Sequence, residues 1–390
     1  MTARLRSFLQ GGFECACQRL PDGRRLDLID GTGHASWARR DYAALRHHGL
    51  LTARDGVRWH RVAREPGRYD WSSLLGQARA ASAHRVQVIW DLCHYGWPDW
   101  LDVWSPAFVD AFARYAAAAA AVLRDESSEA PLYCPINEIS YWAWAGGDMA
   151  HFGPTATGRG GELKRQLVRA TLAAIDAIRA VDPRARFVLA DPAIRVHADH
   201  PDTWPIARQA DAAQYEAWDM LAGRAAAELG GSLAHLDILG VNYYPHNQWV
   251  HGGPGVDRAD PRYVPLRDIL RAMYGRYGKP ILLSETGAEG EARVPWLRYV
   301  CEEVEQARHD GVPMVGICLY PVTDYPGWGD DRPCPTGLFG FAGVDGRRPV
   351  HAPLADEIAY WQHRFAASAC PPALPPTPAG RLASAFGGGG

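Results

Sequence analysis

The sequence lacks the features that mark several common classes of protein. No stretch reaches the ~18 uninterrupted apolar residues of a membrane span, and the nearest, an alanine run at 116–121, lies between Arg114 and Arg124. The N-terminal segment has no apolar stretch of the kind that a secretory signal needs. The net charge is −3 and no basic run occurs, so nothing indicates a nucleic-acid partner. We therefore expect a cytoplasmic protein that binds neither membranes nor nucleic acids.

Motifs for metals and nucleotides are missing as well. The eight cysteines are scattered, Cys15 and Cys17 are too close together for the usual metal spacing, and there is no CxxC or HExxH. Several cysteines lie in apolar runs, where a reduced thiol behaves as a small hydrophobe. No GxGxxG opens a helix, which argues against a doubly wound dinucleotide-binding sheet. The sequence predicts free thiols, no metal and no cofactor.

The chain does contain a regular alternation of short apolar runs and segments with helical spacing. Eight runs lie at 8–14, 50–58, 85–92, 132–137, 186–191, 236–244, 279–285 and 313–320. Most are nearly continuous in Val, Ile and Leu, as expected of parallel strands buried on both faces. The segments between them predict helices, clearest at 105–126, 161–183 and 210–229. Eight such units predict an α/β fold, a single (β/α)8 TIM barrel.

The domain organisation follows from a change of composition near the C-terminus. Residues 1–368 contain the whole alternation and form the expected barrel domain. Residues 369–390 are rich in proline and glycine and cannot bury apolar surface, so we expect a disordered tail.

Two carboxylates stand where a TIM barrel places its active site, at the C-terminal ends of the strands. Glu138 follows the fourth apolar run directly and Glu285 ends the seventh, nearly opposite across the barrel mouth. Cleavage of a glycosidic bond needs one carboxyl group as acid and, when configuration is retained, another as nucleophile. The 15 tryptophans and 16 tyrosines suit the apolar faces of sugar rings. This pattern favours a carbohydrate or glycoside substrate.

Five motifs make a resemblance to a known family specific. They are, in chain order from residue 8, FLQGGFECACQ, LCHYGWP, PINEI, LGVNYY and LLSETG. The chain resembles the family 1 glycoside hydrolases, which are β-glucosidase-like enzymes, and the match continues to about residue 345. The resemblance implies a retaining β-glycosidase, with Glu138 as general acid/base and Glu285 as nucleophile. The positions that it implies for substrate binding are Gln18, Arg54, His94, Asn137, Tyr244, Tyr320 and Trp328.

These roles carry expectations about the surroundings of the two glutamates. We expect Arg54 and Tyr244 to hydrogen-bond Glu285. We expect Glu138 to lie in a more apolar, tryptophan-rich setting that raises its pKa, because it must be protonated to donate to the leaving oxygen. Asp91 and Asp191 are expected to orient their neighbours.

The sequence also departs from the family pattern, in the segment YPVTDYPGW. Tyr320 stands in place of the first tryptophan, Gly327 in place of a glutamate that holds the far hydroxyls of the sugar, and only Trp328 persists. The resemblance is therefore to a divergent branch. Either Asp330 or Asp331 is expected to fill the vacant position, or the space accepts a substituted or longer sugar.

Other functions remain open at this stage. A carbohydrate-binding barrel without turnover would keep the same pocket, and a transglycosylase would use the same two glutamates with a sugar in place of water. A metal-dependent barrel hydrolase could use His34, His94, Asp91 and Glu285, although no HxH follows the first strand. The sugar, the aglycone, exo or endo action and the oligomeric state are not determined by the sequence.

Overall fold

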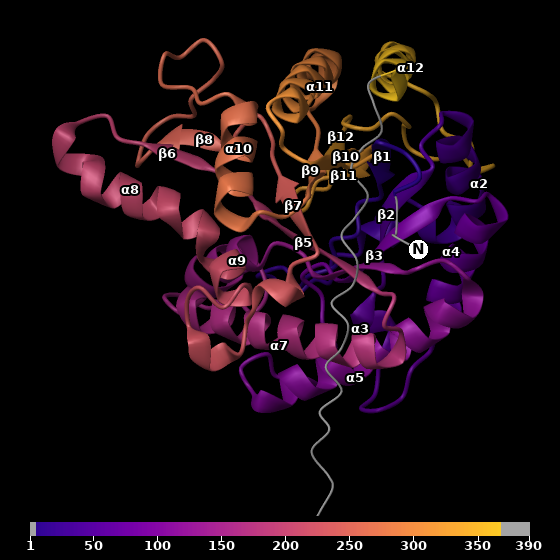
Figure 1. Ribbon diagram of the computed structural model, residues 1–390. Coiled ribbons are helices and arrows are strands. Elements are labelled where there is room, and N and C mark those ends of the chain that lie inside the picture. The colour runs from indigo at the N-terminus through magenta and orange to yellow at the C-terminus, as the bar shows by residue number, and fades with distance from the viewer. Residues whose placement is uncertain (1–4, 368–390) are drawn as a thin grey trace, which may run out of the picture.

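The structure is a computed structural model that describes residues 5–367, so the tail expected at 369–390 lies outside the described residues. Eight parallel strands close into a barrel in the order β1-β2-β3-β4-β5-β7-β9-β10, with β10 returning to β1 (Figure 1). The strands are β1 Leu9–Gly12, β2 Thr52–Gly56, β3 Gln87–Cys93, β4 Leu132–Ile136, β5 Arg186–Pro192, β7 Ile238–Asn242, β9 Ile281–Thr286 and β10 Met314–Leu319. Each lies within one of the eight predicted runs or extends it by a single residue, and the predicted (β/α)8 barrel is confirmed.

Helices surround this barrel. They are α1 Leu28–Gly31, α2 His34–His47, α3 Trp59–Val62, α4 Ser72–Ala83, α5 Pro106–Glu126, α6 Ile139–Trp142, α7 Gly160–Val181, α8 Trp204–Ala212, α9 Glu216–Leu221, α10 Leu266–Tyr277, α11 Arg293–His309 and α12 Ala352–Ala367. A π-helical turn, Ala143–Asp148, continues α6, and short 3₁₀ turns lie at Pro201–Thr203, Ala213–Tyr215, Ala227–Leu229, Leu233–His235 and Gly290–Ala292.

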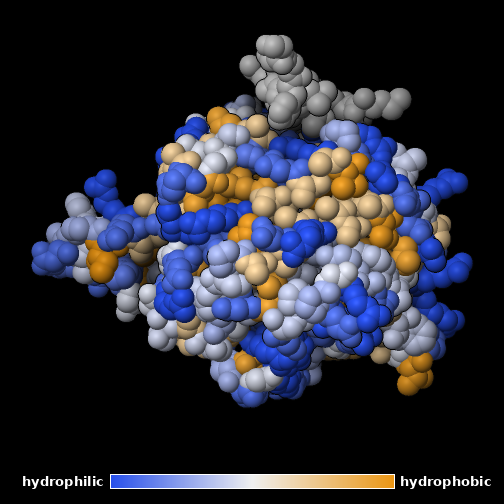
Figure 2. All heavy atoms as spheres, turned by 90° about the horizontal axis from the view of Figure 1, so that it is seen from below, coloured by the Kyte–Doolittle hydropathy of each residue, from blue (hydrophilic) through white to orange (hydrophobic). Residues whose placement is uncertain are grey.

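Helix α5 is the one helix among residues 5–367 that is long and apolar enough to cross a membrane by length and composition alone. It packs against α7 in the outer shell, and Phe108, Phe112 and Tyr115 on its buried face surround the Trp59 ring. On the side where Figure 1 draws α5 and α7, Figure 2 shows polar and apolar residues interspersed. The buried apolar face of α5 thus packs against its neighbours in the shell, and 44% of its apolar stretch is buried.

The predicted helix at 210–229 is wrong as a single element. Helix α8 ends at Ala212, a 3₁₀ turn follows, and α9 ends at Leu221. Gly223 and Ala226 then adopt left-handed backbone, with φ of 71° and 50°. A Cβ on Gly223 would come within 2.3 Å of the Gly231 carbonyl oxygen, so this close turn interrupts the helical path.

Four short strands were not predicted. β6 Arg195–His197 pairs with β8 Gln248–Val250, and β11 Tyr325–Pro326 pairs with β12 Pro333–Cys334. Two or three residues are too few for a period-2 pattern to be visible. Figure 1 shows β6, β8 and α8 projecting to one side of the barrel.

The core divides into two layers. Inward-facing side chains fill the barrel itself, among them Ile89, Val188, Ile238 and Leu282. A larger apolar layer lies between the strands and the helices. The cysteines of the described residues are buried and free, as expected. A filled barrel leaves the C-terminal ends of its strands as the place for a site.

Candidate active site

A cavity of about 1280 Å³ opens at the C-terminal ends of the barrel strands. Of the nine residues selected from the sequence, six line it: His94, Glu138, Tyr244, Glu285, Tyr320 and Trp328. Arg54 and Asn137 lie beneath the lining and are fully buried. Gln18 is also fully buried, does not line the cavity, and has no hydrogen-bond partner for either amide atom.

Glu285 stands near the end of β9, next to an irregularity in the sheet. The register of β9 with β7 shifts between Val241 and Asn242, and Asn242 is the residue paired with Glu285. Irregularities of this kind change the direction of side chains and are common near active sites. Arg54 donates to one carboxylate oxygen at 2.6 Å, and the Tyr244 hydroxyl donates to the other at 2.9 Å. Both contacts are those expected from the sequence. Glu285 is therefore held by a cation on one side and a phenol on the other.

Arg54 connects several strands at once. From β2, its guanidinium donates to Asp91 on β3 at 2.8 Å, to Asn137 after β4 at 2.5 Å, and to Glu285 on β9. The side chain is completely buried. Because a guanidinium offers five donors in a fixed fork, this network sets the positions of all three partners.

Glu138 has a different environment. It follows β4 in left-handed backbone conformation, with φ 48° and ψ 62°, a strained geometry for a residue other than glycine. Asn242 donates to one of its oxygens at 2.9 Å and the Tyr95 hydroxyl donates to the other. Burial and the negative charge of Glu285 raise the pKa of Glu138 to about 8, although Tyr95 and Asn242 act in the opposite direction. The side chain can hold a proton near neutral pH.

The setting of Glu138 differs in part from the expectation. The pKa is raised as expected, but the direct partners are a phenol and an amide rather than tryptophans. Trp142 packs against Tyr95, with ring centroids 6.0 Å apart, and so lies behind the hydrogen-bonding group. Burial, rather than direct tryptophan contact, is the main cause of the shift in the pKa.

Tyr95 and Asn242 received no role from the sequence, although each stands at or just beyond the end of a predicted strand. Asn242 accepts a hydrogen bond from Ser284 Oγ at 2.6 Å, which leaves its amide nitrogen to donate to Glu138. Tyr95 has a φ of 66°, a second left-handed residue beside the site. The available signal was position, because polar residues at the C-terminal ends of the barrel strands converge on one rim.

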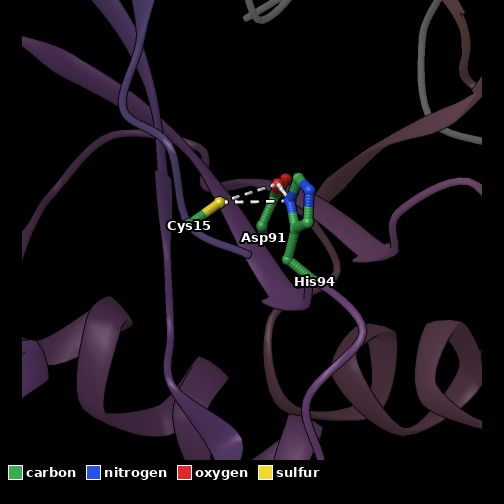
Figure 3. A group of neighbouring side chains, drawn as sticks. All are labelled: Cys15, Asp91 and His94. Atoms are coloured by element: carbon green, nitrogen blue, oxygen red, sulfur yellow. Dashed lines mark hydrogen bonds and ion pairs between the residues drawn. The ribbon is translucent and has the colours of Figure 1, made fainter. Parts of the chain in front are cut away.

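His94 belongs to a buried cluster with Asp91 and Cys15 (Figure 3). The Asp91 carboxylate lies 3.0 Å from His94 Nδ1, and the Cys15 sulfur lies 3.2 Å from the same nitrogen. Three such ligand atoms could hold a metal ion. Each is already engaged, however, because Asp91 also pairs with Arg54 and the Cys15 sulfur lies 3.3 Å from the Tyr320 hydroxyl. The cluster fixes the orientation of the imidazole.

The wider metal-ligand set considered from the sequence is not brought together. His34 is buried against Phe13 and hydrogen-bonds Asp41 and Asp55. Its two ring nitrogens are both used there, away from Glu285.

The position opened by Gly327 is occupied. A Cβ on Gly327 would lie only 2.4 Å from the Asp330 carboxylate, so Asp330 folds back over this glycine and lines the cavity. Asp331 turns outward and pairs with Arg24 at 3.0 Å. Trp328 stays in the cavity wall, edge-on to Tyr95.

Asp191 is the penultimate residue of the neighbouring strand β5 and accepts a hydrogen bond from the Ser140 backbone at 3.0 Å. Burial raises the pKa of Asp191 to about 7, and its charge acts on Glu138. It thus contacts the segment that follows Glu138, as an orienting residue would.

Glu14 is a further carboxyl group in the cavity lining, beyond the end of β1, and received no role from the sequence. Only 5% of the residue is exposed. The signal was again a polar residue at a strand end, but a lone glutamate in that place is more often solvated.

Comparison with known proteins finds similarity in three-dimensional structure but no match by sequence. No protein-family model and no curated protein matches the sequence. Solved structures do match: a family 1 β-glucosidase from Thermotoga maritima has a TM-score of 0.74 at 14% identity, over 94% of this chain and 98% of that one. The β-glycosidase from Thermosphaera aggregans has 0.76 at 16% identity, over 93% and 97%. The AHE enzyme from Alicyclobacillus herbarius has 0.76 at 17% identity, over 94% and 99%. The resemblance found in the sequence is thus confirmed in the fold, which this chain shares over nearly its whole length with family 1 β-glucosidases.

Proposed function

We propose that the protein is a retaining β-glycosidase that uses Glu285 as nucleophile and Glu138 as general acid/base. The observation that carries this proposal is the unequal environment of the two carboxyl groups. A cation, Arg54, holds Glu285, whereas uncharged donors hold Glu138, whose pKa burial raises to about 8. Two titratable groups with environments of this kind divide into an acid and a nucleophile.

The reaction then follows in two steps. The Glu285 carboxylate attacks the anomeric carbon, the bond to the aglycone breaks, and Glu138 gives its proton to the leaving oxygen. The ionised Glu138 next removes a proton from water, the water oxygen bonds to the anomeric carbon, and Glu285 is released. Two inversions leave the anomeric configuration unchanged.

Further residues would support these steps. Tyr244 donates to the oxygen of Glu285 that is not bound by Arg54, so both oxygens are oriented. His94, Tyr320 and Trp328 line the same cavity and would contact the sugar. The orientation of His94 is set by Asp91, and its ring lies parallel to Tyr320.

Trapping of the covalent intermediate tests the proposal directly. In a 2-fluoro glycoside, the fluorine slows both steps, and a good leaving group restores the rate of the first step only. The covalent intermediate therefore accumulates. Incubated protein should gain the mass of one fluorosugar, and peptide mapping should place it on Glu285. NMR of a normal aryl β-glycoside reaction should show the β-anomer first. An α-anomer as first product, or label on another residue, contradicts the assignment.

A sugar hydroxyl could replace water in the second step, which would make the protein a transglycosylase. The same incubation with a high concentration of an acceptor sugar separates the two outcomes by the products formed. We propose hydrolysis, since water needs no further binding site.

A further inference from the structure

The carboxyl group of Glu14 differs from those of Glu138 and Glu285 because it has no side-chain partner among residues 5–367. Glu138 and Glu285 each receive two side-chain donors, one on each oxygen. Glu14 receives only the backbone N–H of Ala16, at 3.0 Å on Oε1. No other hydrogen bond or ion pair reaches it from residues 5–367, and its second oxygen is not among the enclosed unpartnered atoms. That oxygen therefore faces the cavity that Glu14 lines.

Among residues 5–367, no side chain donates a hydrogen bond to Glu14 or forms an ion pair with it. Burial raises the pKa of Glu14, the charge of His94 and the Ala16 N–H lower it, and the charge of Glu285 raises it again. Arg54 also lowers it, but the donors of Arg54 are used by Asp91, Asn137 and Glu285. Both ring nitrogens of His94 contact Asp91 and Asn137 instead of Glu14. A buried carboxylate without a paired cation is costly. A ligand that brings a cation would relieve this cost.

The lining of the whole cavity also has more acidic than basic side chains. Seven acidic residues line it, against one lysine and one arginine. Both of those are already paired, Lys164 with Glu216 at 2.5 Å and Arg332 with Glu289 at 2.6 Å. Glu14 shares its part of the lining with Glu285 and His94, which would hold the sugar rather than the aglycone.

We propose that Glu14 binds a protonated amino group on the sugar, so that the cavity selects amino sugars as the glycone. The inference rests on the proposed use of the cavity as a glycoside site and specifies its substrate class. The free oxygen accepts a charge-assisted hydrogen bond from the ammonium group. A neutral hydroxyl in the same place makes a hydrogen bond but leaves the buried charge uncompensated.

Calorimetry of free sugars binding to the full chain tests this inference, because the free sugars are not hydrolysed. The probes are glucose and galactose, and their analogues with one hydroxyl replaced by an amino group, at a pH where the amines are protonated. One amino analogue should bind about tenfold to a hundredfold more tightly than its parent sugar, the range for a charge-assisted hydrogen bond. N-acetylation of that amine, which removes the charge, should abolish the gain in the wild-type protein.

Glu14→Gln is the matched substitution, since its amide oxygen can still accept from Ala16 N–H. It should reduce the amino-to-hydroxyl preference to within about twofold, because only the charge is removed. Glu291→Gln removes the same charge from an exposed position outside the cavity lining and should leave the preference intact. If the Glu14→Gln variant does not fold, the comparison of the amine with its N-acetyl form in the wild type decides.

Two results overturn the inference: no amino analogue that binds more tightly than its parent, or a preference that survives Glu14→Gln. Aryl β-glycoside hydrolysis is scored separately. Retaining hydrolysis without an amine preference refutes the inference alone. An amine preference that depends on Glu14, in a protein that hydrolyses no β-glycoside, refutes the proposed function and leaves the binding site in place.

Discussion

Replacing Tyr95 by phenylalanine should move the basic limb of the pH–activity profile to higher pH. The Tyr95 hydroxyl donates to Glu138 and lowers its pKa. Removal of that donor disfavours the ionised carboxylate, so Glu138 keeps its proton to a higher pH. In the wild type the limb should lie near pH 8, where Glu138 ionises.

The size of the shift has an upper bound. A hydrogen bond to a charged group contributes about 1.5–3 kcal/mol, and one pKa unit corresponds to about 1.4 kcal/mol. Full loss of the bond thus gives about one to two pH units. Asn242 still donates to the other oxygen at 2.9 Å, so the observed shift should not exceed this range.

The measurement is kcat/KM against pH for an aryl β-glycoside with a poor leaving group, whose cleavage depends on the proton of Glu138. Tyr141→Phe is the matched control, because Tyr141 lines the same cavity but makes no hydrogen bond to Glu138. Its profile should match that of the wild type. A basic limb that stays in place or moves down in the Tyr95 variant refutes the reasoning.

Further predictions concern activity and stability. Glu138→Ala should spare substrates with good leaving groups and regain rate with added azide; equal loss on all substrates without rescue contradicts the acid role. Asp191→Asn should shift the basic limb down, since the charge of Asp191 raises the pKa of Glu138. Arg54→Met should cost about 3–5 kcal/mol in urea unfolding, because it leaves buried charges unpaired. Burial lowers the pKa of His34, but its partners Asp55 and Asp41 raise it more, so that the pKa lies at about 9. Since this pKa exceeds that of an unfolded histidine, about 6.5, the stabilisation is complete below pH 6.5 and is lost as pH rises through 9. A melting temperature that does not fall over this window would argue against the assignment.

The parts of the fold that the sequence predicts well are those set by local pattern. The eight barrel strands are nearly continuous apolar runs, and their ends converge by the geometry of a closed parallel barrel. Because the strand ends converge, the sequence alone predicts that Glu138 and Glu285 lie in one site. The end of the helical path at Leu221 was missed because the left-handed turn at Gly223 depends on its contact with Gly231, which is 8 residues further along the chain.

The finer chemistry of the site depends on contacts that no local pattern encodes. The role of Asn242 is decided by Ser284, which fixes the direction of its amide. Glu14 differs from an ordinary loop glutamate through its burial and because, among residues 5–367, no side chain hydrogen-bonds its carboxyl group. The approach of Asp330 to Gly327 depends on the turn in which Gly327 N–H donates to the Arg332 carbonyl, a contact that no local pattern encodes. That the space accepts a substituted or longer sugar stays a prediction.

The connections of Arg54 have a consequence for how the protein acquires its structure. Its partners Asp91 and Asn137 lie 37 and 83 residues along the chain, but Glu285 lies 231 residues away. A nascent chain that ends before β9 can close most of the barrel wall, yet it cannot supply the last of these partners. The entropy of closing so long a loop is lost before the contact between Arg54 and Glu285 can stabilise the chain, so this contact forms late. Folding intermediates should therefore contain an Arg54 guanidinium that still lacks Glu285 as a partner. The part of the cavity that Glu138 and Glu285 line should then be among the last regions to become ordered, and a chain truncated before β9 should fail to form it.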